Sequence, residues 1–484
     1  MIKNITVKTA VAALLVVGSL SARTLTQYTD KTFLAPRAQN ANLAMEYTTW
    51  HRHPFMMHDK TMKTHLQIAP FWQESKRERD LGKYFGVNGQ NAFKIDGTIA
   101  AGTYIIQDRT NSAISTIKLS PRQRMFGSRV ELFQDVNTPF KGLFFRLSAP
   151  VVHVENDMQA RFTNETPANA VAGAMTFSKF FRGDSSNPQQ VSLNKARMSK
   201  RTATGVADLD ISLGAKLRDS EQGSLLLSID GTVPTGTRVR GNYVFEPVCG
   251  NGHHFGLGGS MNGSVRMWHN DVGSVRLVAA IRYKYLFESS EARTFSADPD
   301  AKFGQYYKLG NVQQPHKALL TPAANVLTLP IAIKPGHQFD ALAAFSFHSN
   351  GFTIDGGYNM FFKDAEHGKL NSFADSGKYV VAKDNFNPTT NPNTLFGSTP
   401  AADYAPEINT ASNNLITKAR LEAGLSRLLT PASLTHKVFG GVGHTSKIYD
   451  KHDLSFGLGA SYEFAMSNAD LENYAVWGKM GVSF

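Results

Sequence analysis

The stretch VRLVAAIRYKYLFE, residues 275–288, alternates between two kinds of side chain. Its odd-numbered positions are all apolar or aromatic, whereas its arginine, lysine and glutamate residues all occupy even-numbered positions. Successive side chains of a β-strand point to opposite faces, so this alternation gives one strand an apolar face and a partly charged face. A strand in a soluble protein averages about five or six residues, whereas about 9–11 residues cross a bilayer. The stretch therefore predicts a membrane-spanning β-strand.

The same alternation recurs along the chain, clearly so in 208–218, 339–348, 352–363 and 454–464. Applied to the whole sequence it predicts these strands: 64–75, 117–134, 141–155, 207–218, 223–234, 254–268, 274–288, 338–348, 352–363, 435–447, 453–466 and 473–484. Bacterial single-chain barrels have even strand numbers, with short periplasmic turns and longer external loops. We therefore expect an all-β fold, a single transmembrane antiparallel β-barrel of about twelve strands. Its long extracellular loops would be 76–116, 156–206, 289–337 and 364–434.

Two further segments leave the strand number open. Residues 93–106 are apolar enough to form a strand, and residues 415–429 alternate as well. The second segment is rich in Leu, Ala, Arg, Lys and Glu and precedes Pro431, which suits an amphipathic loop helix equally well. If both segments span the membrane, the barrel has fourteen strands.

The first residues have the pattern of an export signal. Lys3 and Lys8 precede the short apolar run 10–17, and small residues follow up to Ala22. The run is too short for a spanning helix, which needs about 20 residues. We expect a signal peptide over 1–22, an N-terminal periplasmic segment over 23–63 and an outer-membrane β-barrel over 64–484.

The end of the chain carries the most specific signal. Residues 474–484 alternate between outward and inward positions and stop on Phe484. An alternating last strand that ends in phenylalanine resembles the C-terminal signature that the barrel-assembly machinery of bacterial outer membranes recognises. Phe484 is accordingly the expected assembly signal, with the outer membrane of a Gram-negative bacterium as the expected location.

Composition excludes several other classes. With 42% hydrophobic and 19% charged residues, the chain is neither disordered nor uniformly apolar. One cysteine, Cys249, excludes an intramolecular disulfide framework. The net charge of +12 comes from Lys and Arg spread over strands and loops, so no nucleic-acid partner is expected. The same basic balance suits anionic lipopolysaccharide and outer-membrane lipid as partners.

If the apolar face of each strand meets lipid, the opposite face lines the lumen. The charged residues predicted to line the lumen are Arg146, Asp208, Asp210, Lys216, Arg218, Asp230, Arg266, Arg276, Arg282, Lys284, Asp340, Asp355, Lys363, Glu463 and Lys479. Charges of both signs suit a water-filled pore, but they could equally fill and stiffen a narrow barrel, because twelve strands lie between filled and open sizes. The sequence leaves an open or a plugged lumen undecided.

Motifs for catalysis or metal binding are weak. The sequence holds no Gly-x-Ser-x-Gly, phosphate-binding loop or His-Glu-x-x-His motif, so we expect neither an enzyme nor a cofactor. His51, His53, His58 and His65 lie close together beside methionines, yet their spacing matches no defined site, so no metal is expected.

One part of the chain resembles a known family. Gly205-Val206-Ala207-Asp208, the following strand and Pro234-Thr235-Gly236 are similar to the outer-membrane barrels of phenol meta-pathway degradation, which are related to fatty-acid-transport barrels. The resemblance covers about 200–290 and implies passage of hydrophobic compounds. The segment that follows Ala22 lacks the Asn-Pro-Ala-like start and the hatch pattern of the fatty-acid transporters.

These observations favour an outer-membrane channel or transporter for small solutes, hydrophobic ones among them. The alternative is a surface-display or structural barrel whose long loops bind a host, a phage or another protein. Neither the substrate nor the oligomeric state follows from the sequence.

Overall fold

The computed structural model describes residues 27–49, 64–100, 103–106, 114–136, 142–163, 177–184, 192–299, 303–311, 321–381, 415–448 and 452–484. The expected signal peptide, 1–22, therefore lies outside the described residues.

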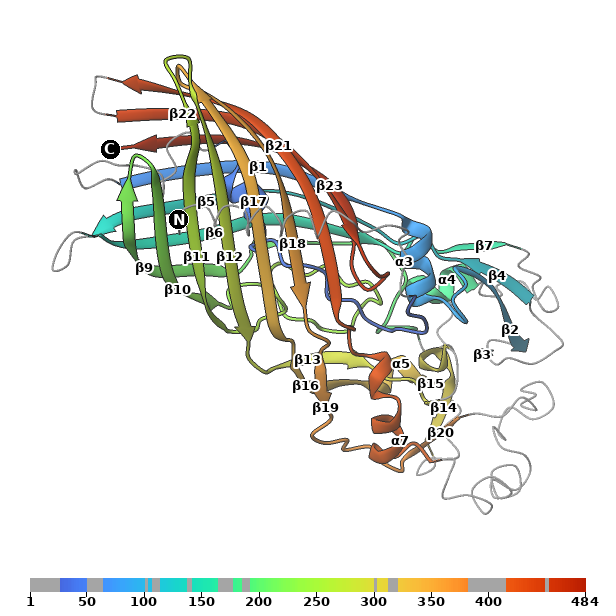
Figure 1. Cartoon of the computed structure of the whole chain (residues 1–484). Helices are drawn as coiled ribbons and strands as arrows, with labels where there is room; N and C mark the ends of the chain where they lie inside the picture. Colours follow the sequence, from blue (N-terminus) through green and yellow to red (C-terminus); the bar gives the residue numbers. More distant parts are fainter. Residues whose placement is uncertain are drawn as a thin grey trace, which may run out of the picture.

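A closed antiparallel barrel of twelve strands forms the body of the molecule (Figure 1). Its strands are β1 (Thr64–Lys76), β5 (Arg122–Val136), β6 (Leu143–Asp157), β9 (Leu209–Ser220), β10 (Gly223–Val233), β11 (Gly256–His269), β12 (Ser274–Leu286), β17 (Gly336–Ser349), β18 (Phe352–Lys363), β21 (Ser433–Ile448), β22 (His452–Ala465) and β23 (Glu472–Ser483). Each strand pairs with its two sequence neighbours in this order, and β1 closes the ring by pairing with β23. The prediction of twelve strands is confirmed.

The two segments that left the count open lie outside the barrel. The described residues of 93–106 belong to β2 (Ala92–Ala100) and β3 (Thr103–Ile106), part of a small separate sheet. Residues 415–429 contain the helix α7 (Lys418–Ala423). The expected strand 117–134 is also divided: its start belongs to β4 (Ile114–Lys118), and β5 begins only after Pro121, which has no N–H to donate to a ladder.

The alternation seen in the sequence becomes the two faces of the wall. Outward apolar side chains are widely exposed, as in Ile229 at 68% and Leu458 at 66%. Inward positions hold buried polar residues such as Arg129, Glu131 and Asn262. An apolar exterior around a polar interior is the arrangement that a lipid bilayer requires.

The barrel wall is irregular beside Pro150 on β6. The first part of β6, residues 143–148, pairs with β9. The later part, residues 151–156, pairs with β8 (Arg201–Val206), the strand just before β9 in sequence. Strands β8 and β9 thus form one long strand that is interrupted at Ala207 and Asp208, opposite the proline that has no N–H to offer.

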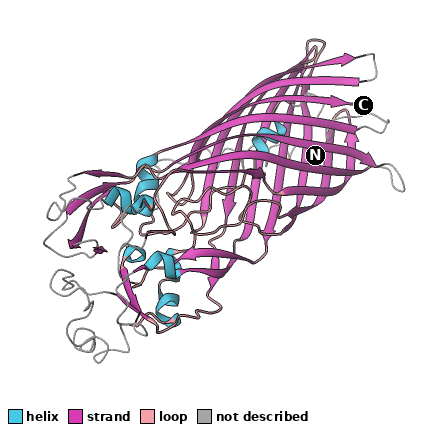
Figure 2. Ribbon diagram, turned by 180° about the vertical axis from the view of Figure 1, so that it is seen from behind, coloured by secondary structure: helices cyan, strands magenta, loops and turns pink. Residues whose placement is uncertain are grey.

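The described parts of the long connections lie at one end of the barrel and fold into a cap (Figure 2). The remaining elements of the cap are α3 (Glu78–Phe85), β7 (Arg161–Thr163), α4 (Phe177–Arg182), β13 (Ser289–Thr294), η2 (Gly304–Tyr306), β14 (Lys308–Asn311), β15 (Thr321–Pro322), α5 (Ala323–Leu327), β16 (Thr328–Lys334), β19 (His367–Lys369), β20 (Tyr379–Val381) and η3 (Leu425–Arg427). By the general rule for bacterial barrels, the opposite end, with short turns, faces the periplasm.

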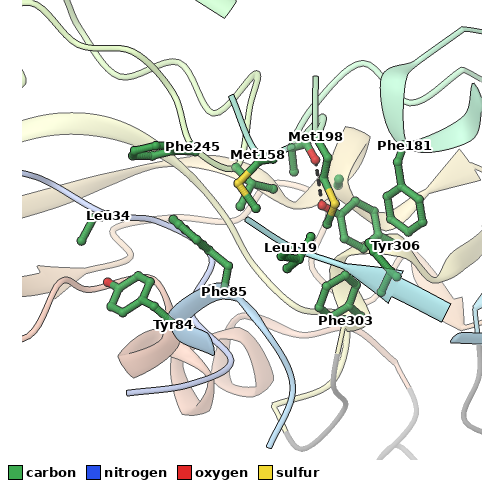
Figure 3. Close-up of a cluster of buried hydrophobic side chains, with 14 of the residues drawn as sticks. Leu34, Tyr84, Phe85, Leu119, Met158, Phe181, Met198, Phe245, Phe303 and Tyr306 are labelled. Atoms are coloured by element: carbon green, nitrogen blue, oxygen red, sulfur yellow. Dashed lines mark hydrogen bonds between the residues drawn. The ribbon is translucent and has the colours of Figure 1, made fainter. Parts of the chain in front are cut away.

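The cap has its own hydrophobic cores. Figure 3 shows one of them, in which Phe181 and Tyr306 lie edge to face at 4.7 Å between ring centroids. The Tyr306 hydroxyl donates to the carbonyl of Ala196 at 2.8 Å, so the one polar atom of this ring is satisfied. Leu34, from the segment before the first strand, belongs to the same core. Within the described ranges no helix is long and apolar enough to cross a membrane.

Candidate functional site: a plugged lumen

Residues 27–49 run from the cap into the barrel and occupy part of its lumen. At the cap end, the Tyr28 amide donates to Asn468 at 2.7 Å, and the Tyr84 hydroxyl donates to the carbonyl of Phe33 at 2.8 Å. Farther along, the short helix α2 (Leu43–Tyr47) is wholly buried, and the side chain of Asn42 caps it by accepting from the Met45 amide. We call residues 27–49 the plug.

The plug meets the wall through one carboxylate that faces three arginines. Glu46 is fully buried and forms ion pairs with Arg129 of β5, Arg146 of β6 and Arg282 of β12. The Arg129 and Arg282 contacts measure 3.1 and 2.9 Å. Glu131 pairs with Arg146 at 3.1 Å, which offsets part of the remaining positive charge. A buried charge is tolerated only when it is paired in this way.

A second ion pair fixes the plug nearer the cap. The Arg37 guanidinium pairs with Asp340 of β17 and with Glu463 of β22, each at 2.8 Å. It also donates to Asn359 of β18 and lies 4.3 Å from the centroid of the Phe361 ring. One side chain of the plug therefore joins three strands of the wall.

The last described residues of the plug fit against glycines. A Cβ atom on Gly457 would come within 2.3 Å of Thr49 Oγ1, and one on Gly441 within 2.4 Å of Thr48 Cγ2. Lys479 donates to the backbone carbonyls of Glu46 and Thr48, at 3.0 and 2.6 Å. Inward glycines thus provide the space for the close approach of the plug to the wall.

The middle of the plug is held by apolar contacts as well. Leu43, Ala44, Met45 and Tyr47 pack with inward apolar side chains of the strands. These are Ala69, Phe133, Phe144, Leu226, Val278, Ala280, Leu342, Ala344, Phe439, Ala475 and Trp477. The lumen therefore combines a charged wall with an apolar section around α2.

The position of the plug differs from the sequence expectation. Residues 23–63 were expected to be a periplasmic segment, and the sequence shows no hatch pattern; the described part, 27–49, nevertheless lies inside the barrel. Its polar residues are few and irregularly spaced, and their partners lie on strands as many as 426 residues away, as for Arg37 and Glu463. Spacing along the sequence therefore gives no sign of the pairing.

The structure divides the predicted lumen residues into three groups. Eight of them contact the plug: Arg146, Asp210, Arg282, Asp340, Asp355, Lys363, Glu463 and Lys479. Two support the first group, since Lys284 pairs with Asp210 and Asp230 lies 3.9 Å from Arg282. The other five lie elsewhere: Asp208 at the break before β9, and Lys216, Arg218, Arg266 and Arg276 towards the short-turn end.

Sequence reasoning missed the plug side of these contacts, namely Arg37, Asn40 and Glu46, and also Arg129 and Glu131 on the wall. For Arg129 and Glu131 a signal was present, because both occupy inward positions of the alternating strand 117–134. For the plug residues we find none.

Asp208 organises the part of the chain that carries the family resemblance. Its carboxylate accepts from the amide of Asn251 at 2.7 Å and from the amide of Gly236 at 3.3 Å. The Thr235 hydroxyl donates to the carbonyl of Ala207 at 2.6 Å. The Gly-x-x-Asp and Pro-Thr-Gly motifs therefore meet at one place, where they hold the connection between β10 and β11 against the break in the wall.

A small cavity of about 50 Å³ lies between the plug, the cap and the cap end of the wall. Phe33, Val239, Val248 and Leu286 supply apolar lining. The charged lining residues are Glu291, Lys363, Asp364 and Glu366. Its volume is well below the roughly 300–1,000 Å³ of drug-sized ligand sites.

A buried charge network borders this cavity. His254 Nε2 lies 2.9 Å from Glu291, and its Nδ1 lies 2.8 Å from the carbonyl of Phe287. Arg293 joins Glu291 to Glu366. Burial alone would lower the pKa of His254, but the hydrogen bond and charge of Glu291 and the Phe287 carbonyl raise it above its ordinary value. Because both ring nitrogens face acceptors, the imidazolium form fits the site.

Of the four histidines considered as metal ligands, His65 alone falls within the described residues. His65 lies on β1, where its Nδ1 is 2.7 Å from the Ser483 hydroxyl, and His51, His53 and His58 lie outside the described residues. In the described part of the chain, no three His, Cys, Asp or Glu side chains are arranged to hold a metal ion.

A closed barrel with an apolar outer wall and an N-terminal segment in its lumen defines a plugged β-barrel of the bacterial outer membrane. No family model and no curated protein matches the sequence. Among solved structures, an outer membrane channel from Pseudomonas putida F1 is 9% identical, with a TM-score of 0.37 over 89% of this chain and 98% of that one.

Two other solved structures show the same level of similarity. A FadL homologue from Pseudomonas aeruginosa is 6% identical, with a TM-score of 0.30 over 93% of this chain and 99% of that one. The CymD monoaromatic hydrocarbon channel is 8% identical, with a TM-score of 0.30 over 94% and 98%.

Proposed function

We propose that the protein is an outer-membrane channel for small solutes with an apolar part, and that movement of the plug controls passage. The observation that carries the proposal is the plug itself, held by ion pairs with the wall at Arg37 and at Glu46. When the ion pairs between plug and wall separate, water that enters the lumen can hydrate the charged groups. Release of the plug therefore leaves a polar path and not a set of unpaired buried charges.

The apolar section of the lumen supports the solute class. When α2 is in place, it covers inward apolar side chains such as Phe133, Phe144 and Leu226. Release of α2 exposes these side chains, and an apolar solute can replace the contacts that they lose. The small cavity beside Phe33 and Val239 lies at the cap end of the same route.

The experiment ties the plug to the wall and measures transport. Thr49 and Gly443 are close, since a Cβ on Gly443 would lie 3.2 Å from Thr49 Cβ, near the roughly 3.5–4.5 Å of a disulfide. The variant Thr49→Cys with Gly443→Cys is refolded into liposomes and compared with each single variant. Burial raises the pKa of the native Cys249 thiol to about 11, which keeps it protonated and inert.

Oxidation of the double variant is expected to abolish uptake of a small aromatic solute and conductance in planar bilayers, and reduction is expected to restore both. The single variants should respond to neither treatment. Undiminished uptake in the fully oxidised double variant would show that the plug is not the gate.

The folded cap favours a second candidate function, surface binding, because its hydrophobic cores make it a preformed structure. Deletion of residues 382–414 separates the two functions. A channel should keep or increase its conductance, whereas a display protein should lose its partner and show no conductance in either form.

A further inference from the structure

One sector of the outer wall changes from aromatic to charged at the same height on adjacent strands. The strand register places Val476, Trp72, Phe126 and His153 side by side in one row. These side chains face outward, as the exposure of Phe126 at 56% shows. The ring centroids of Phe126 and His153 are 4.8 Å apart. Aromatic side chains at this position are typical of the boundary between lipid tails and headgroups.

The next row towards the cap is charged. It holds Tyr474, Glu74, Arg124 and Glu155, which the register again places side by side. Above that row follow Glu472, Lys76, Arg122 and Asp157. Arg77 and Lys200 extend the patch through ion pairs with Glu472 and Glu155. The cap ends of β1 and β23 approach α3 here (Figure 1).

Within this sector the cations lie outside and their acidic partners lie beneath them. The side chain of Arg124 is 43% exposed, against 11% for its partner Glu74. Arg77 is 44% exposed against 5% for Glu472, and Lys200 is 55% exposed against 20% for Glu155. The carboxylates therefore orient the cations while the exposed surface is positive.

Glu74 is the centre of this arrangement. One of its oxygens lies 3.2 Å from Arg124 Nε and 3.5 Å from Arg122 Nη1, and the other accepts from the Tyr474 hydroxyl at 2.8 Å. Lys76 lies 4.7 Å from the centroid of the Tyr474 ring. Each arginine has five N–H donors, so donors remain to bind an anion.

We infer that this sector, which we call the basic belt, binds a phosphorylated glycolipid of the outer leaflet. The phosphates would meet Lys76, Arg122 and Arg124, and the acyl chains would lie on the apolar wall below the aromatic row. Charge complementarity favours an anionic headgroup, and the position at the long-loop end of the barrel places the belt in the outer leaflet. A lipid with two phosphates matches a patch that extends from β1 across β5 to Lys200, which pairs with Glu155 of β6.

The test removes the exposed charges and measures lipid binding by native mass spectrometry of the refolded full chain. The belt variant carries Lys76→Gln, Arg122→Gln and Arg124→Gln. The matched control carries Lys378→Gln, Lys418→Gln and Lys447→Gln, which removes three exposed charges elsewhere. The lipids are diphosphorylated lipid A, its dephosphorylated form and phosphatidylglycerol. A heat-modifiable gel shift confirms that each variant is folded.

The wild type and the control are expected to bind lipid A tightly. The belt variant should bind it about a hundredfold more weakly, because each cation near an anionic membrane surface contributes roughly fivefold and three are removed. Dephosphorylated lipid A should bind weakly to all three proteins. Equal binding of lipid A by the belt variant and the control would overturn the inference. Equal binding of phosphatidylglycerol and lipid A by the wild type would do the same, because it would indicate general attraction to anionic lipid.

Discussion

The carboxylate of Glu46 offers the sharpest test of how the plug is held. Glu46→Gln keeps the size of the side chain and its ability to form hydrogen bonds, but removes the charge that faces Arg129, Arg146 and Arg282. The exposed fraction of Glu46 is zero, so water does not screen these contacts in the docked state.

The expected effect is large. Loss of one partner of a buried ion pair costs about 3–5 kcal/mol. Glu131 still pairs with Arg146 at 3.1 Å, and Asp230 lies 3.9 Å from Arg282, so some compensation remains and the lower end applies. A change of about 3 kcal/mol shifts the balance between docked and released plug roughly a hundredfold towards release.

Single-channel recording measures this balance directly. The variant should show a much larger open fraction than the wild type in planar bilayers, while its gel shift on heating is unchanged. Glu422→Gln, on the exposed surface of α7, is the matched control and should behave as the wild type does. An open fraction within twofold of the wild type for a folded Glu46→Gln barrel would refute the reasoning.

Three further perturbations have defined outcomes. Gly457→Ala places a methyl group against Thr49 and should raise the conductance without unfolding the barrel; unchanged conductance would contradict the tight fit. The raised pKa of His254 means that its pair with Glu291 stabilises the cap fully below about pH 6.5 and is lost as the pH rises through the folded value. Hydrogen exchange in β13, corrected for intrinsic rates, should therefore speed up at high pH, and His254→Gln should remove that dependence. Phe484→Ala should lower the yield of assembled barrel in the outer membrane. A yield equal to that of the wild type would contradict the role of Phe484 as an assembly signal.

The barrel could be predicted from the sequence because the requirement that lipid imposes on each strand involves only neighbouring residues. Lipid demands an apolar side chain at every second position, and the resulting period, visible in 275–288, fixes both the existence and the orientation of each strand. Pro121 shows the limit of this reasoning, since the alternation continues across it while the ladder does not.

Only the wall residues of the candidate site could be predicted from the sequence, and the plug residues could not. The alternation of inward and outward positions identified the wall residues of the site, including Arg146, Arg282 and Glu463, because each strand's own sequence determines which residues point inward. The other half depends on which segment enters the lumen. Arg37 and Glu46 find their partners through the closed fold, and no period in their own segment records this.

The position of the plug also constrains the order of assembly. β1 pairs with the last strand, β23, so the ring is sealed only after the final residues of the chain are in place. The plug precedes β1, yet its charged side chains touch strands around the circumference, from β5 to β22. A segment held on so many sides is enclosed as the strands gather more readily than it is threaded into a finished cylinder. The plug can thus act as a template that brings distant strands to the correct curvature. A barrel with a defective plug would therefore close slowly during assembly, in addition to any defect in gating.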